Sequence, residues 1–162
     1  MVKEKPKESV IGELKTFLLH GTLLIIILFI GAVAFVMLYD KYVALPEAKK
    51  IVTKTNHLNT VLYISDELQK CSSGETTAMD GGITCSGNTA AKTVTAAVSK
   101  MKDKNPYVAA NNAVRSSTSN TNDEDVGFIN LSASGSIIII KSCIKTSCSK
   151  EENRQTSTVS IE

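Results

Sequence analysis

One uncharged stretch near the N-terminus constrains this chain more than any other feature. Residues Phe17–Leu38 read FLLHGTLLIIILFIGAVAFVML and contain no charged side chain. As a helix this stretch would be about 33 Å long, enough to cross a bilayer core of about 30 Å. Because Thr22–Leu38 has no polar face to turn toward water, a buried helix of a soluble domain is not expected. We therefore predict a transmembrane helix over residues 17–42, closed by Tyr39 and Tyr42 at the interface.

The same stretch differs from a cleaved secretory signal. It is longer than the apolar core of a signal peptide, which is about 7–15 residues, and no small-x-small site ends it before Asp40. Its flanks do not set the orientation, because each carries four lysines: Lys3, Lys5, Lys7 and Lys15 before it, and Lys41, Lys49, Lys50 and Lys54 after it.

All the cysteines, Cys71, Cys85, Cys143 and Cys148, lie after the apolar stretch. An even number on one side of a membrane favours two disulfides in an oxidising compartment. Zinc is the rival, but the spacings lack the tight C-x-x-C pairs of structural zinc sites; free thiols are the remaining alternative. Of three connectivities, Cys71–Cys85 with Cys143–Cys148 closes the shortest loops and is expected. We predict a cytoplasmic leader over residues 1–16 and an extracytoplasmic head over residues 43–162.

Composition and residue types give the head no catalytic or nucleic-acid signature. The net charge is only +2, so no strong field points to nucleic acid. The two histidines, His20 and His57, are expected at a membrane edge and on an exposed helix face, and no set of nucleophile and base can be picked out. The acidic run 120–125 lacks the pattern of an EF-hand and is expected to be a solvated loop. We expect a chain that is not an enzyme and holds no metal or cofactor.

The head begins with two stretches of helical periodicity. A helix is predicted over residues 47–70, interrupted near its start by Pro46. Its apolar stripe, expected to face the core, comprises Ala48, Ile51, Leu58, Val61, Leu62 and Leu68. A Gly/Ser/Thr-rich loop follows over residues 71–88. A second helix is predicted over residues 89–103, capped by Asn88 or Thr89 and ended by the turn at Pro106.

The remaining residues, 107–162, have the pattern of a small antiparallel sheet. Strands are predicted at Val126–Leu131, Ser136–Lys141 and Thr156–Ile161, with a weaker one near Ala113–Ser116. The four consecutive isoleucines from Ile137 suggest a central strand covered on both faces. The predicted fold class is α+β: a long N-terminal helix and a second helix with a sheet of three or four antiparallel strands.

This layout resembles the type IV pilins and pseudopilins. The stretch Tyr39-Asp40-Lys41-Tyr42 is similar to the Tyr-x-x-Tyr that follows the family's apolar segment. The turn at Asn105-Pro106-Tyr107, Gly135 before an isoleucine-rich strand, and the pair Cys143/Cys148 near the end are also pilin-like. The resemblance implies a pilin-like head and a structural subunit of a type IV pilus or pseudopilus. Its partners would be membrane lipid, other copies of itself, related subunits and a prepilin peptidase.

The family's processing motif is where the sequence departs from the pattern. A leader cleavage between Gly21 and Thr22 would place Ile26 where the family has a glutamate; after Gly12, Phe17 would take that place. Within the apolar helix, Gly31 and Ala34 are small enough to let neighbouring helices approach closely, and in a filament they would lie at a packing face. The alternative is that any membrane helix tolerates small residues at such positions. The alternative function is a monomeric, single-pass anchored protein whose outer domain serves binding or adhesion.

Overall fold

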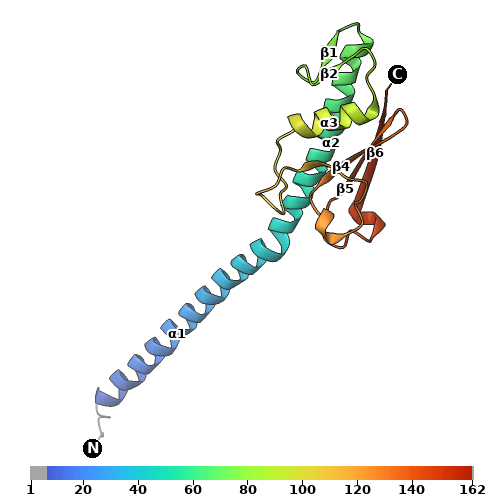
Figure 1. Cartoon of the computed structure of the whole chain (residues 1–162). Helices are drawn as coiled ribbons and strands as arrows, with labels where there is room; N and C mark the ends of the chain where they lie inside the picture. The colour runs from blue at the N-terminus through green and yellow to red at the C-terminus, as the bar shows by residue number, and fades with distance from the viewer. Residues whose placement is uncertain (1–6, 162) are drawn as a thin grey trace, which may run out of the picture. The chain divides into compact units, whose positions relative to one another are not determined.

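The structure, a computed structural model, describes residues 7–161, and Figure 1 traces the whole chain. Every residue from Lys7 to Ser72 is helical: α1 (Lys7–Tyr39), a π-helical turn η1 (Asp40–Ala44) and α2 (Leu45–Ser72). The chain divides into two compact units, with the boundary between Leu45 and Pro46. The predicted leader falls in part on residues 1–6, outside the described residues.

The π-helical turn η1 ends at Ala44, two residues before Pro46. Proline has no backbone N–H and its ring crowds the carbonyl four residues back, so a regular α-helical hydrogen bond cannot form there. A wider turn is one way for a helix to absorb such a defect. Pro46 is the second residue of α2, a position near a helix start that tolerates proline.

The second unit, which we call the head, contains α2, a small hairpin, a second helix and a sheet. The hairpin pairs β1 (Thr77–Ala78) with β2 (Ile83–Thr84) inside the stretch expected to be a loop. Helix α3 (Ala90–Lys100) is capped by Thr89, one of the two expected caps, whose side chain accepts a hydrogen bond from the Lys92 N–H. It ends before residue 103, because Met101 is already extended.

A four-stranded sheet completes the head, in the order β3-β4-β5-β6. Its strands are β3 (Val114–Ser116), β4 (Ile129–Ser134), β5 (Ile137–Cys143) and β6 (Arg154–Ser160). The pairs β4–β5 and β5–β6 are antiparallel, but β3 pairs with β4 in parallel. The expectation of a purely antiparallel sheet was therefore wrong. The fold is α+β with a mixed sheet.

Strand β4 starts three residues later than predicted because Gly127 lies in a turn. Its φ is +77°, and a Cβ there would stand 2.3 Å from the Asn105 Oδ1. Only glycine fits this position. The β4–β5 hairpin turns at Gly135 and Ser136, with Ser134 opposite Ile137.

One face of the sheet forms the core. Leu131, Ile138 and Ile140 are fully buried and belong to the same cluster as Ile64 of α2 and Val94 of α3. Both helices therefore cover this face of the sheet. The opposite face is not covered in the same way: Ile137 is 41% exposed and Ile139 is half-buried. The isoleucine run was wrongly interpreted as a strand covered on both faces.

Both disulfides join cysteines that are close in sequence. Cys71 at the end of α2 forms a disulfide with Cys85 after β2, with 5.1 Å between their Cα atoms. Cys143 at the end of β5 binds Cys148, with 5.5 Å between their Cα atoms. This is the pairing expected from proximity. The first disulfide fastens the β1–β2 hairpin to α2.

Candidate interaction surface

Helix α1 presents apolar side chains in every direction. Phe29 and Phe35 are 71% and 69% exposed, and each described large apolar residue from Leu24 to Leu38 is exposed. Among the described residues, one helix is long and apolar enough to cross a membrane, and it begins near the N-terminus. A surface of this kind needs lipid or other helices around it.

The small residues of α1 leave room for a neighbour. A Cβ at Gly31 would meet nothing within 4 Å. Ala34 lines a shallow apolar depression together with Phe29, Ile30, Val33 and Met37. Gly21 and Thr22, the predicted cleavage position, are exposed residues inside α1. The structure does not bring Gly21 and Thr22 together with Gly31 and Ala34 into one site.

Helix α2 turns its apolar stripe outward. Ile51, Leu58 and Leu62 are 61%, 56% and 50% exposed. These three residues lie on one helix face because they are spaced seven and four residues apart. We call them the outer stripe. Of the six residues expected to face the core, only Leu68 is buried and Val61 half-buried, so this prediction was wrong for most of the stripe.

The buried face of α2 is instead largely polar. Besides Ile64 and Leu68, it comprises Thr53, Asn56, His57, Thr60 and Glu67. The threonine hydroxyls donate to carbonyls one turn back, Thr53 to Lys49 at 2.9 Å and Thr60 to Asn56 at 2.7 Å. Polar groups can be buried at low cost when each finds a partner.

His57 is buried and joins α2 to two strands of the sheet. Its Nε2 lies 2.9 Å from the Ser157 Oγ of β6, and its Nδ1 lies 3.0 Å from the Ser142 Oγ of β5. A neutral imidazole has one donor and one acceptor nitrogen, which two hydroxyl groups can satisfy. Burial lowers the pKa of His57 below 6.5. The expectation that His57 is exposed was wrong.

Glu67 holds the β1–β2 hairpin against α2. Its carboxylate accepts hydrogen bonds from the backbone N–H of buried Met79 and from the Lys70 Nζ at 2.5 Å. Burial by itself would raise the pKa of this carboxyl, but the bonds from Lys70 and Met79 outweigh it and lower the pKa below 4.5. Met79 itself has a positive φ of 53°. Glu67 therefore stabilises a turn that is unfavourable for an ordinary residue.

The acidic run 120–125 also serves the fold. Asp125 accepts from the Arg115 guanidinium at 2.6 Å and from the Ser119 hydroxyl at 2.7 Å, and Asp123 accepts from the Cys148 N–H at 2.8 Å. Residues 121–124 are exposed, as expected of a solvated loop, whereas Asp125 is buried and engaged in structural hydrogen bonds. Among the residues described, no group of three His, Cys, Asp or Glu side chains could hold a metal ion.

Acid should weaken the head through His57. Because burial favours its neutral form, the unfolded chain binds a proton more readily, and stability falls as the pH drops below about 6.5. The slope approaches at most about 1.4 kcal/mol per pH unit for one proton. The measurement is urea unfolding of the full chain in detergent micelles from pH 8 to 5.

The His57→Gln variant provides the control, because it removes the titrating ring. Its stability should be nearly independent of pH between about 7 and 5. Glu67 does not affect the measurement between pH 7 and 5. Because its pKa is lowered, its contribution to stability is lost only as the pH falls below about 4.5. An equal slope in wild type and His57→Gln would contradict the assignment.

Comparison with protein-family models, with curated proteins and with solved structures finds no match for this chain. The class of protein therefore rests on its own features: one apolar helix of membrane-spanning length, a disulfide-bonded α+β head, and an exposed apolar stripe on the head's first helix. This arrangement can insert into lipid and can pack against other helices.

Proposed function

We propose that the chain is a structural subunit of a filament of the type IV pilus or pseudopilus class, assembled through its N-terminal helices. In this proposal the leader is cytoplasmic, the head is extracytoplasmic, and α1 anchors the subunit in lipid before assembly. The observation that carries the proposal is the outer stripe of α2, Ile51, Leu58 and Leu62, which is exposed on a helix whose other face is buried in the head.

The outer stripe separates the filament from the alternative function. In a monomeric anchored protein, lipid would cover the apolar surface of α1 up to Leu38. The following segment contains Asp40, Lys41, Glu47, Lys49 and Lys50, and such charges are costly in hydrocarbon. The stripe comes after these charges, so another protein surface is its better partner. In a filament, helices of neighbouring copies would cover both α1 and the stripe.

Placing a charge on the outer stripe should prevent assembly without unfolding the head. We expect Leu58→Lys to reduce sheared fibres at least about tenfold, because an unpaired ammonium would be buried between subunits. The matched control is Asn59→Lys, which adds the same charge at the next exposed position of α2. Fibre yield is measured in cells that carry a pilus assembly machinery, and head stability by thermal unfolding.

A second variant tests the part of the proposed assembly that involves α1. Gly31→Leu fills space that is open in the single chain, so it should reduce fibres while the head melts at the wild-type temperature. Wild-type chains that stay entirely in the membrane with an uncut leader would favour the monomeric anchored protein. A normal yield of fibres from Leu58→Lys would show that the outer stripe is not part of the interface between subunits.

A further inference from the structure

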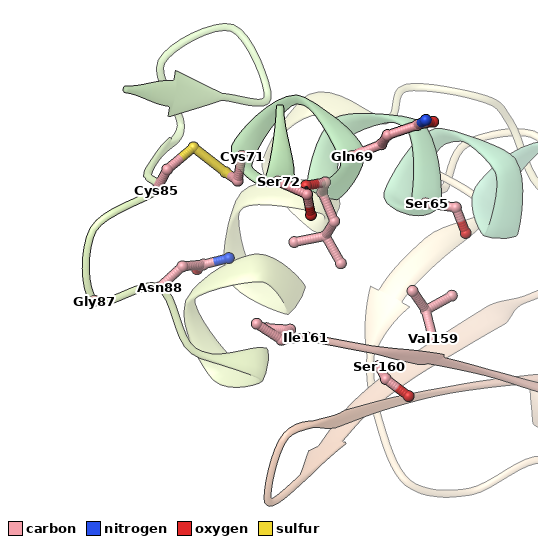
Figure 2. A pocket seen from close by; sticks show the side chains of 11 residues that line it. Ser65, Gln69, Cys71, Ser72, Cys85, Gly87, Asn88, Val159, Ser160 and Ile161 are labelled. Atoms are coloured by element: carbon pink, nitrogen blue, oxygen red, sulfur yellow. A yellow bond between two sulfur atoms is a disulfide. The ribbon is translucent and has the colours of Figure 1, made fainter. Parts of the chain in front are cut away.

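A pocket of about 550 Å³ opens in the head at the end of the last strand. Figure 2 shows its three walls: the end of α2, the loop after Cys85, and the end of β6. Its volume is within the range of ligand-binding clefts. The disulfide Cys71–Cys85 fixes the loop wall to the helix wall.

The pocket lining is neutral throughout. Leu68, Val159 and Ile161 supply apolar surface continuous with the core. Ser65, Gln69 and Ser160 supply hydroxyl and amide groups, and within the described residues these three side chains make no hydrogen bond. Among the described lining side chains a charged ligand would find no opposite charge, and it would lose hydration without compensation. The nearby Lys92 ammonium donates to the Gly87 carbonyl of the loop wall at 3.0 Å. The chemistry therefore selects an uncharged ligand with apolar and hydrogen-bonding parts.

The strand that forms one wall of the pocket has an open edge. β6 is last in the sheet order, so only β5 pairs with it. The Ile161 N–H donates to Ser136 and the Ile144 N–H donates to Asn153. By the alternation of an antiparallel ladder, the backbone N–H and C=O of Thr156, Thr158 and Ser160 point away from β5.

After its first residue, Arg154, β6 lacks the usual protection against strand addition. Lysine, proline and acidic residues do not occur from Gln155 to Ser160, although such residues commonly block exposed edges. Unpaired backbone groups at every second residue match the spacing of an extended polypeptide. Sugars and lipids do not present such a repeat of peptide groups.

We propose that β6 and the pocket together bind an extended, uncharged polypeptide segment of a partner protein. The segment adds to the edge of β6 as a fifth strand of the sheet and places one aliphatic side chain against Leu68, Val159 and Ile161. This binding site is separate from the outer stripe of α2, and the proposal does not depend on the filament.

The probe is a display library of ten-residue peptides, selected on the full chain in detergent micelles, with the selected sequences then synthesised. We expect enriched peptides to be uncharged and rich in β-branched residues. Thr158→Pro should weaken binding at least about tenfold, because proline has no backbone N–H to donate to the peptide. An edge strand tolerates proline at a residue whose N–H points away from the sheet. Thr158→Ala keeps this N–H and is the matched control.

Two further measurements locate the peptide. Ser65→Trp, which fills the pocket, should weaken binding, whereas Asp66→Trp, on the neighbouring exposed position, should not. N-methylation of the peptide at alternate residues should abolish binding in one register and spare it in the other. Unaltered thermal unfolding of each variant shows that the head remains folded.

Several outcomes would overturn the proposal. They are enrichment of charged peptides, binding that tolerates Thr158→Pro, or N-methylation without any alternation. Dimers of the chain in micelles that disappear with Thr158→Pro would assign the edge to a second copy instead of a partner protein.

Discussion

Truncating Leu131 to alanine should lower the free energy of unfolding by about 2–5 kcal/mol, because the side chain is fully buried between the sheet and the helices. Leu62→Ala removes the same atoms from the outer stripe of α2, where the side chain is half exposed. We expect its cost to be below about 0.5 kcal/mol. The measurement is urea unfolding of the full chain in detergent micelles at neutral pH.

The contrast between these two leucines tests which face of α2 is buried. If the apolar stripe faced the core, as its periodicity suggests, Leu62→Ala would cost as much as Leu131→Ala. Equal losses would therefore contradict the observed orientation of α2. Unequal losses would confirm that the head buries the face of His57 and Glu67.

Placing arginine at Ile27 should impair membrane insertion. Ile27 lies near the middle of the apolar stretch, and an arginine there costs about 2.5–3.5 kcal/mol of apparent insertion free energy. The fraction of chains that resist alkaline carbonate extraction should fall accordingly. Val2→Arg, outside the apolar stretch, adds the same charge and should leave the membrane fraction unchanged.

Retention of Ile27→Arg in the membrane at the wild-type level would show that something other than α1 holds the chain there. The head offers a second check, because Ile27 lies in the first unit and the core of the head lies in the second. The thermal unfolding of the head should therefore be the same for wild type and Ile27→Arg.

Local signals predicted much of the architecture. Thr89 caps α3, and the isoleucine run from Ile137 and the alternation over Thr156–Ile161 placed β5 and β6 within two residues of their observed starts. The cysteine pairing followed from short loop closure. Each of these features depends on residues that are close in sequence, so a single sequence contains the necessary information.

Features that depend on distant partners were missed. The parallel pairing of β3 with β4 is invisible in the residue pattern of a three-residue strand. The exposure of Ile137 was also hidden, since alternating side chains point to both faces and a run of isoleucines does not reveal what covers each face. The pocket beside β6 joins residues from 65 to 161 and had no local signature.

The sequence by itself determined an uncharged helix long enough to span a membrane and a small disulfide-bonded α+β head. Only the tertiary structure decided which face of α2 is buried. Helical periodicity gives a helix two faces, and the more apolar one normally enters the core. Here His57 forms hydrogen bonds with Ser142 and Ser157, and Glu67 accepts one from the Met79 N–H. These polar side chains of α2 therefore have hydrogen-bond partners in the interior of the head. The outer stripe consequently remains on the surface, where a partner can cover it.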